Sequence, residues 1–370
     1  MVFIAGPRQV GKTTLAKEIL KGGGGGAYYL WDNKDDRREI MKARWPVEPS
    51  TVVLDEIHKY KKWKRWVKGE FDKHRDHLRI IVTGSARLDV YRKGGDSLQG
   101  RYHHYRLHPF SVAELAGRRS LPGPFAPLEF SAAAAETLDA LLRFSGFPEP
   151  ALARSERVHR RWQKERVDRF FREDVRDLEA VREMSSIQLL SDLVPEKVGS
   201  PLSLNSLRED LDASHKAVAH WMDVLERLYF VFKLRPFTAK LIRSLKKGPK
   251  YYLWDWSMIE DPGARFENMV ASHLLKFCHL LEDAEGHRAE LHYLRDEDKR
   301  EVDFLVTVNR KPWFAVEAKL SDTEPAAALR YFGARLEIPF LYQVVRDANK
   351  DFESNGVRVI PAAKFLAGLV

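Results

Sequence analysis

The loop over residues 6–13 constrains the fold more than any other part of the sequence. It reads Gly-Pro-Arg-Gln-Val-Gly-Lys-Thr and fits the pattern G-x-x-x-x-G-K-[ST]. The apolar run Val2–Ala5 before it is typical of a buried strand, and the segment after it predicts a helix with an apolar stripe at Leu15, Ile19 and Leu20. A strand, a glycine loop and a helix in this order are the context in which the pattern binds phosphate. The sequence therefore predicts a phosphate-binding loop.

The residue types in this loop suit a nucleoside triphosphate. Gly6 and Gly11 let the main chain turn sharply and bring its N–H groups to phosphate oxygens. The N-terminus of the following helix adds partial positive charge. We expect Lys12 to reach the β- and γ-phosphates and Thr13 to place its hydroxyl on Mg²⁺.

A second strand, over residues 51–56, ends in two carboxylates. Beside a phosphate loop, Asp55 is placed to hold Mg²⁺ through water, and Glu56 to orient and polarise the attacking water. Asp55-Glu56-Ile57-His58 also spells the box of DExH helicases, but such enzymes need a second nucleotide-binding lobe that the sequence downstream does not offer. The loop and this strand together predict an ATPase-type site.

Further polar residues follow the strand over 78–82. Thr83 or Ser85 is placed to sense the γ-phosphate, and Arg101, with Arg87 second, is the candidate arginine finger; a surface arginine without this role is the alternative. Thr13 and Asp55 are the expected Mg²⁺ ligands of this site. The residues expected to contact the nucleotide are Gly6, Pro7, Arg8, Gln9, Val10, Gly11, Lys12, Thr13, Thr14, Asp55 and Ser85.

The run Gly-Pro-Arg-Gln-Val-Gly-Lys-Thr-Thr, the Leu-Asp-Glu-Ile box, the Thr-Gly-Ser strand end and the Leu-x-Gly-Arg step resemble one prokaryotic family. Its members are AAA+-superfamily ATPases fused to a C-terminal domain of restriction-endonuclease-like fold, and the resemblance covers nearly the whole chain. It implies an α/β P-loop NTPase domain of the AAA+/ASCE type over residues 1–150, a parallel sheet flanked by helices, ATP hydrolysis with Mg²⁺, and self-association as a ring or dimer. Members usually carry a helix before the first strand that helps to enclose the adenine, whereas this sequence starts on the strand. The preference for ATP or GTP therefore stays open.

Charge and composition favour an anionic partner. Lys and Arg number 62 against 53 Asp and Glu, a net charge of +9 with a pI near 9.4, which favours DNA. In the basic segment 58–79, Trp63, Val67 and Phe71 recur every four residues, so one helix face is expected to pack on the sheet while the other is either solvated or in contact with DNA. The single cysteine and the lack of a membrane-spanning apolar run predict a soluble, cytoplasmic protein without a membrane partner.

The middle of the chain, residues 151–262, predicts a helical connector followed by a winged helix-turn-helix. A charged helix over 154–182 precedes helices at 185–193, from 202 and from 214, and the strands over 229–234 and 250–254 read as a wing. Such a fold either binds DNA or serves protein contacts only, and both stay open. The residues offered to DNA would be Ser214, His215, Lys216 and His220, with Arg243, Lys246, Lys247 and Lys250 on or near the wing.

The C-terminal part, residues 263–370, carries a second constellation. Asp303 on one strand and Glu317-x-Lys319 on the next have the spacing of PD-(D/E)xK nucleases, in which two carboxylates hold Mg²⁺ or Mn²⁺ and a lysine orients water or neutralises phosphate. If the strands pair with Phe304 opposite Val316, their apolar side chains share one face, and Asp303 lies opposite Glu317 on the other. The sequence therefore predicts a restriction-endonuclease-like α/β domain.

A glutamate in the preceding helix supports this site. Glu267 lies on an otherwise apolar helix face, where a carboxylate is costly without a charged partner, and a metal ion or Lys319 would be such a partner. Gln343 is a further candidate for the site. The expected catalytic residues of the whole chain are Lys12, Glu56, Arg101, Asp303, Glu317 and Lys319, and the expected metal ligands are Thr13, Asp55, Glu267, Asp303 and Glu317. Two readings stay open: a nuclease that cuts DNA, and a nucleotide-switched module whose nuclease fold is inert and only binds.

Overall fold

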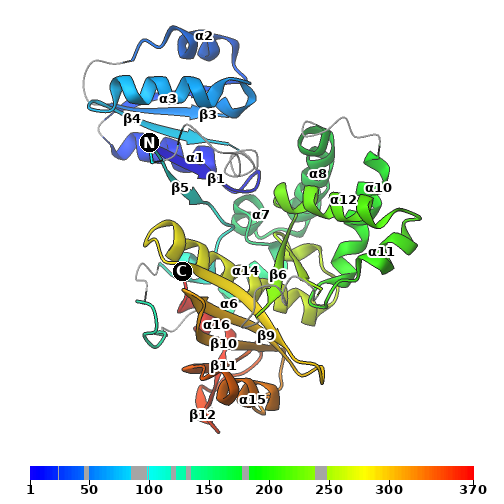
Figure 1. Ribbon diagram of the computed structural model, residues 1–370. Coiled ribbons are helices and arrows are strands. Elements are labelled where there is room, and N and C mark those ends of the chain that lie inside the picture. Colours follow the sequence, from blue (N-terminus) through cyan, green and yellow to red (C-terminus); the bar gives the residue numbers. More distant parts are fainter. Residues whose placement is uncertain are drawn as a thin grey trace. The chain divides into compact units, whose positions relative to one another are not determined.

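The computed structural model describes most of the chain in two compact units (Figure 1). One unit comprises residues 1–108 with 227–229, and the other residues 109–226 with 230–370. The described residues are 1–23, 25–45, 50–84, 98, 100–117, 122–130, 135–176, 183–237 and 248–370. Five residues named above, Ser85, Arg87, Arg243, Lys246 and Lys247, lie outside them. In the described part, no helix has the length and apolar character needed to cross a bilayer.

The first unit is a five-stranded parallel sheet in the order β2-β3-β4-β1-β5. Strand β4, which ends in Thr83, pairs directly with β1. The strands are β1 (Val2–Ala5), β2 (Gly26–Leu30), β3 (Ser50–Asp55), β4 (Leu78–Thr83) and β5 (His103–Arg106). The helices are α1 (Lys12–Gly22), α2 (Lys34–Lys42), η1 (Ile57–Lys59) and α3 (Trp63–His74).

Helices cover both faces of this sheet because its strands are apolar on both sides. Trp63 and Val67 of α3 pack on one face, as predicted. On the other face α1 contributes Ala16 and Leu20. The predicted stripe of α1 is partly wrong, since Leu15 and Ile19 are 38% and 40% exposed. The loop turns the first helical residue inward, so the buried face continues one turn later at Ala16.

The second unit is built on an eight-stranded mixed sheet in the order β12-β13-β11-β10-β9-β8-β6-β7. Its strands are β6 (Val231–Pro236), β7 (Lys250–Leu253), β8 (Ala289–Arg295), β9 (Glu301–Val308), β10 (Lys311–Lys319), β11 (Phe340–Val345), β12 (Phe352–Ser354) and β13 (Val357–Pro361). Strands β9 and β10 pair with Phe304 opposite Val316, which confirms the predicted register.

The helices of this unit precede the sheet in the chain, connect its strands or, in the case of α16, follow its last strand. The long helix α14 (Pro262–Asp283) buries ten of its residues, including Phe266 and Phe277, and packs against β8. The others are α5 (Val112–Leu115), α6 (Ala135–Phe144), α7 (Pro148–Ala153), α8 (Glu156–Arg169), η3 (Phe170–Val175), α10 (Met184–Leu193), η4 (Val194–Lys197), α11 (Leu204–Asp210), α12 (His215–Arg227), η5 (Trp256–Met258), α15 (Ala327–Leu336) and α16 (Ala362–Ala367).

The two strands expected to form a free wing belong to the C-terminal sheet. Strands β6 and β7 pair with each other, and β6 also pairs in parallel with β8 through Arg235 and Pro236. Burial explains why β7 belongs to the sheet. Every residue of β7, Lys250 included, is buried, whereas a wing that contacts DNA would be exposed. The sheet therefore extends across residue 262, and Lys250 is not a wing residue at the surface.

Candidate functional site

The loop over residues 6–13 has the main-chain geometry that its glycines predict. Gly6 has φ +146° and Gly11 has φ +102°, both in the region that favours glycine. A Cβ atom at Gly6 would lie 2.4 Å from the carbonyl oxygen of Leu107, so no side chain fits there. Gly11 caps α1, whose main-chain N–H groups begin at Lys12. The helix N-terminus and the loop thus present donors on one side, as an anion site requires.

Lys12 points back into the loop. Its side chain is buried, with 8% of its surface exposed, and its ammonium group donates hydrogen bonds to the carbonyl oxygens of Gly6 (2.9 Å) and Pro7 (2.7 Å). A buried ammonium group next to a helix N-terminus gives the loop positive electrostatic character. This charge matches the anionic oxygens of a nucleotide.

Asp55, at the end of β3, lies beside the loop. Its carboxylate accepts hydrogen bonds from Thr13 Oγ1 (2.8 Å), Tyr28 OH (2.7 Å) and Thr83 Oγ1 (2.5 Å). Thr83, considered above as a γ-phosphate sensor, uses its hydroxyl to hold Asp55. The sequence analysis missed Tyr28 of β2, because nothing in the local pattern shows that this tyrosine reaches the carboxylate at the end of the neighbouring strand β3.

Glu56 has the environment of a group that handles protons. Its φ of +59° turns the chain sharply after β3, and its main-chain N–H bonds Thr83 O at 3.0 Å. Its carboxylate lies 3.5 Å from Lys59 Nζ and 3.6 Å from His58 Nε2. Burial, the largest effect, raises the pKa of Glu56 above its ordinary value, while the charge of Lys59 acts in the opposite direction.

Arg101 lies at the other edge of this sheet. It precedes β5, whose first residue pairs with Val2, and its carbonyl oxygen accepts a hydrogen bond from the ammonium group of Met1 at 3.2 Å. The phosphate loop follows the opposite end of β1. The guanidinium group is 2.8 Å from Asp72 Oδ1 of α3. Arg101 therefore cannot serve the loop of its own chain, and a finger role requires a second copy.

The residues of this site fit a nucleotide with Mg²⁺. The hydroxyl of Thr13 and the carboxylate of Asp55 are oxygen ligands within hydrogen-bond distance of each other, which is the donor chemistry that Mg²⁺ prefers. Lys12 and the main-chain N–H groups supply the complementary charge for phosphate. Of the predicted residues, the structure brings Gly6, Gly11, Lys12, Thr13 and Asp55 together.

The predicted C-terminal residues also converge, on β9, β10 and α14. Asp303 Oδ2 accepts a hydrogen bond from the main-chain N–H of Ala318 (2.9 Å), and Glu317 Oε2 accepts one from the N–H of Asp303 (3.4 Å). Lys319 Nζ donates to Glu317 Oε1 at 2.7 Å. The two carboxylates and the lysine thus share one face of the hairpin, as the register predicts.

The sequence analysis missed three members of this group, Lys250, Tyr252 and Glu301. Lys250 is 1% exposed, and its ammonium group lies 2.5 Å from Glu301 Oε1 and 3.7 Å from Glu267 Oε1. Tyr252 OH donates to the same Glu267 oxygen at 2.8 Å. The partner of Glu267 is therefore Lys250 with Tyr252, where a metal ion or Lys319 was expected. Below, the acid cluster means Glu267, Glu301, Asp303 and Glu317.

Burial dominates the electrostatics of the acid cluster. Burial and then the charge of Asp303 raise the pKa of Glu267 to about 8 and that of Glu317 to about 7. Burial also raises the pKa of Asp303, against the attraction of Lys250. For Lys250, burial alone lowers the pKa, but the charges of Glu267, Asp303 and Glu301 outweigh it and raise the pKa.

As arranged, the acid cluster does not fit a divalent cation. Lys250 and Lys319 already lie against three of its carboxylates, and Glu267 also accepts the hydrogen bond of Tyr252. Across the described ranges, no three His, Cys, Asp or Glu side chains come close enough together to hold a metal ion. Metal-dependent hydrolysis therefore receives no support from this geometry.

Gln343 does not complete the acid cluster. It pairs with Glu317 across β10 and β11, but its amide serves a neighbouring loop. Oε1 accepts from the N–H of Ala326 at 2.8 Å, and Nε2 donates to the carbonyl oxygens of Asp322 (2.9 Å) and Glu324 (2.8 Å). These contacts use the amide to hold the segment between β10 and α15.

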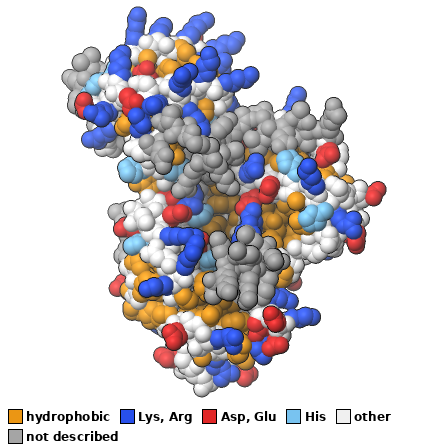
Figure 2. Space-filling view, viewed as in Figure 1, with side chains coloured by type: hydrophobic (Ala, Val, Ile, Leu, Met, Phe, Trp, Pro, Cys, Tyr) orange, Lys and Arg blue, Asp and Glu red, His pale blue; other side chains and the backbone are white. Residues whose placement is uncertain are grey.

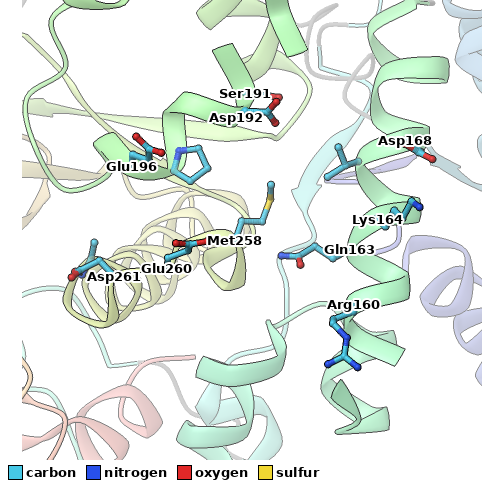
Figure 3. Close-up of a pocket in the computed structure, with 13 residues that line it drawn as sticks. Arg160, Gln163, Lys164, Asp168, Ser191, Asp192, Glu196, Met258, Glu260 and Asp261 are labelled. Atoms are coloured by element: carbon cyan, nitrogen blue, oxygen red, sulfur yellow. The ribbon is translucent and has the colours of Figure 1, made fainter. Parts of the chain in front are cut away.

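A cleft of about 880 Å³ lies elsewhere in the second unit, between α8, η4 and the start of α14 (Figure 3). Gln163 of α8 faces Met258 and Glu260 across it. It contains none of the predicted site residues. Its charged lining is mixed, with Arg160, Lys164, Asp168, Asp192, Glu196, Glu260 and Asp261.

Family models match the chain in three consecutive segments. Residues 1–116 match an AAA domain, residues 135–260 a domain of unknown function (DUF8612), and residues 262–365 another domain of unknown function (DUF4143). Together with the parallel sheet and the phosphate loop, the first match defines an AAA-type P-loop domain at the start of the chain.

Similar proteins are found in archaea and bacteria. An uncharacterised protein of Methanocaldococcus jannaschii is 22% identical over 311 residues, which cover 80% of this chain and 68% of that protein. An uncharacterised protein of Mycobacterium tuberculosis is 21% identical over 383 residues, covering 99% of this chain and 81% of that one. The second alignment includes the P-loop domain and everything that follows it.

Solved structures show weaker likenesses. RuvB of Thermotoga maritima aligns with a TM-score of 0.28 and 18% identity over 66% of this chain and 86% of that one. The ORC1 protein of Aeropyrum pernix, solved in complex with DNA, aligns with a TM-score of 0.33 and 14% identity over 73% of this chain and 86% of that one. Both scores lie below the level at which alignment over this length implies a shared fold.

Proposed function

We propose that the protein binds and hydrolyses a nucleoside triphosphate, ATP in the first instance, at the loop over residues 6–13. The observation that carries this proposal is the meeting of Lys12, Thr13 and Asp55 at the end of a parallel sheet, with Glu56 next in the chain. The match of residues 1–116 to an AAA domain supports it.

Each side chain has one task in this proposal. Lys12 and the N–H groups at the start of α1 neutralise the phosphate oxygens. Thr13 and Asp55 hold Mg²⁺, which supplies charge compensation between the β- and γ-phosphates when bound. Glu56 orients the attacking water and accepts its proton. Its raised pKa makes it a stronger base for this step than an ordinary carboxylate. Arg101, contributed by a second copy in a ring or dimer, stabilises developing charge.

Two substitutions separate nucleotide binding from hydrolysis. Lys12→Ala is expected to abolish ATP binding, whereas Glu56→Gln keeps binding and lowers the turnover rate by about 100-fold or more. Binding of a fluorescent ATP analogue and release of phosphate measure the two steps, with GTP in parallel to settle the base preference. Lys21→Ala, on the exposed side of α1, is the matched control. Full hydrolysis by the Lys12→Ala variant would contradict the proposal.

We further propose that the protein is directed to DNA. The supporting observation is the basic surface of the first unit, where Lys and Arg side chains gather over α2 and α3 (Figure 2). If α3 contacts phosphates, Arg65→Glu with Lys73→Glu reduces the slope of log affinity against log salt by about two. Lys311→Glu with Lys350→Glu changes the net charge equally outside this helix and is the control. Equal slopes for the two double variants would remove α3 from the interface.

For the C-terminal unit, a binding platform agrees better with the contacts than a nuclease does. The acid cluster holds lysines where a nuclease needs a metal ion. Incubation of the protein with plasmid and linear DNA in Mg²⁺ or Mn²⁺ tests this choice. Intact DNA is the expected result, and cleavage that Asp303→Ala and Glu317→Ala abolish would establish the nuclease instead.

A further inference from the structure

Lys250 is fixed in place by the main chain on both of its sides. It is the first residue of β7, where it pairs with Leu234 of β6, and an isolated bridge joins it to Pro201 on the other side. The N–H of Leu202 also bonds the carbonyl oxygen of Pro249 at 3.0 Å. Because the strand cannot move without breaking these contacts, the ammonium group stays among the carboxylates.

Lys319 is held less firmly than Lys250. Its side chain is 36% exposed, against 1% for Lys250, and its ammonium group lies 2.7 Å from Glu317 Oε1. A ligand can displace Lys319 toward solvent, but Lys250 has no such route. The Glu267 carboxylate is enclosed further by Tyr252 and by Gly199, where a Cβ atom would lie 3.0 Å from Glu267 Oε2.

Buried carboxylates need positive charge, and this cluster has two possible sources of it. Four carboxylates are balanced in part by Lys250, Lys319 and Arg295, the last at 2.5 Å from Glu301 Oε2. A divalent cation is the other source, but it would lie next to the ammonium group of Lys250, and like charges repel strongly where water is excluded. The two cations are therefore mutually exclusive.

We propose that the ammonium group of Lys250 is the resident cation of the acid cluster, and that it excludes divalent metal from this site in the wild-type protein. The cluster is then an ion network that joins β7, β9 and α14, and the residues that resemble a nuclease site hold the sheet together across residue 262. This inference is independent of nucleotide hydrolysis, which takes place in the other unit.

Titration of the full-length protein with Mn²⁺, without nucleotide, tests this proposal through the electron paramagnetic resonance signal of free Mn²⁺. The fraction of binding that Glu317→Gln removes is assigned to the acid cluster. Wild type is expected to show no such fraction. Lys250→Met is expected to create it, because the competing ammonium group is gone. Lys233→Met, a lysine of β6 paired with Glu226 outside the cluster, is the control and stays at the wild-type level.

Removal of one buried charge can unfold a protein, so a second variant accompanies the first. Lys250→Met with Glu301→Gln removes one charge of each sign and leaves Glu267, Asp303 and Glu317 in place. It is expected to bind Mn²⁺ as Lys250→Met does. Wild-type binding that depends on Glu317 overturns the proposal whatever the variants do, and so does a folded double variant that binds no Mn²⁺.

Discussion

Asp55 is held by three hydroxyl groups, and two of them come from residues that no phosphate motif includes. Thr13 belongs to the loop, but Tyr28 and Thr83 reach Asp55 from β2 and β4. If Mg²⁺ binds as proposed, the hydroxyl of Thr13 would become a ligand of the metal. Tyr28 and Thr83 then keep the carboxylate in position. Both are therefore positioning residues for the metal rather than contacts of the nucleotide.

Tyr28→Phe is expected to raise the Mg²⁺ concentration required for half-maximal ATPase activity by roughly tenfold or more, since a hydrogen bond to a charged group contributes about 1.5–3 kcal/mol. Nucleotide affinity in EDTA should be unchanged, because the phosphates contact Lys12 and the loop. Tyr29→Phe, on the opposite face of β2, is the control. An unaltered Mg²⁺ requirement in Tyr28→Phe would show that Thr83 alone positions Asp55.

Some of these residues were accessible from the sequence and others were not, for a physical reason. Lys12, Thr13 and Asp55 belong to short contiguous patterns whose spacing already encodes the site. Tyr28 and Lys250 act through contacts between distant strands, which spacing does not encode. Lys250 also follows Lys246 and Lys247, and such a basic stretch predicts exposed side chains rather than a buried one.

Helix α14 joins α5 through a buried histidine. His273 is 2% exposed, its Nδ1 bonds the carbonyl oxygen of Met269 at 2.8 Å, and its Nε2 accepts the N–H of Val112 at 3.1 Å. With one nitrogen donating and the other accepting, the ring must be neutral. Burial is the main reason that the pKa of His273 is lowered to about 4, and the charge of Lys276 acts in the same direction.

The lowered pKa of His273 predicts that the free energy of unfolding depends on pH. The unfolded chain takes up the proton near pH 6.5 and the folded chain only near pH 4, so stability is greatest above about pH 6.5. It should fall toward pH 4 by up to about 1.4 kcal/mol per pH unit and then level off. Urea unfolding at several pH values measures this, and His273→Gln should flatten the slope. His215→Gln, on an exposed position of α12, is the control; a parallel slope in His273→Gln would exclude His273 as the source.

Strands β6 and β7 show where element prediction from sequence reaches its limit. The sequence predicts both strands as a hairpin, and the structure confirms that they pair. Their sheet does not follow, because a hairpin after three helices fits a wing and a sheet edge equally well. The deciding contacts are those of Arg235 with His292 and of Pro236 with Tyr293, more than fifty residues apart in the chain.

The chain as a whole divides at residue 108 rather than at the domain ends that sequence motifs suggest. The second unit includes α5 through α12 as well as the C-terminal strands, because β6 and β7 complete a sheet that begins at β12. The family models divide the same stretch at residue 260. A segment can thus recur as a unit in sequence and still depend on its neighbour to fold.

This dependence can be tested by truncation. Residues 109–370 are expected to be expressed as a folded unit with a single cooperative thermal transition. Residues 263–370 are expected to aggregate, since β8 loses its partner β6 and becomes an open sheet edge.

The shorter fragment also loses the cation of the acid cluster. Without Lys250 and Tyr252, the partly buried Glu267 and Glu301 have less compensating charge, which adds to the cost of folding. Circular dichroism and size-exclusion chromatography of both fragments measure the difference. Glu267→Gln with Glu301→Gln in the shorter fragment separates the two causes: recovery of a folded monomer would assign the defect to charge, and continued aggregation to the exposed edge of β8. A shorter fragment that melts cooperatively at the temperature of the longer one would mean that the C-terminal strands form their core without β6 and β7.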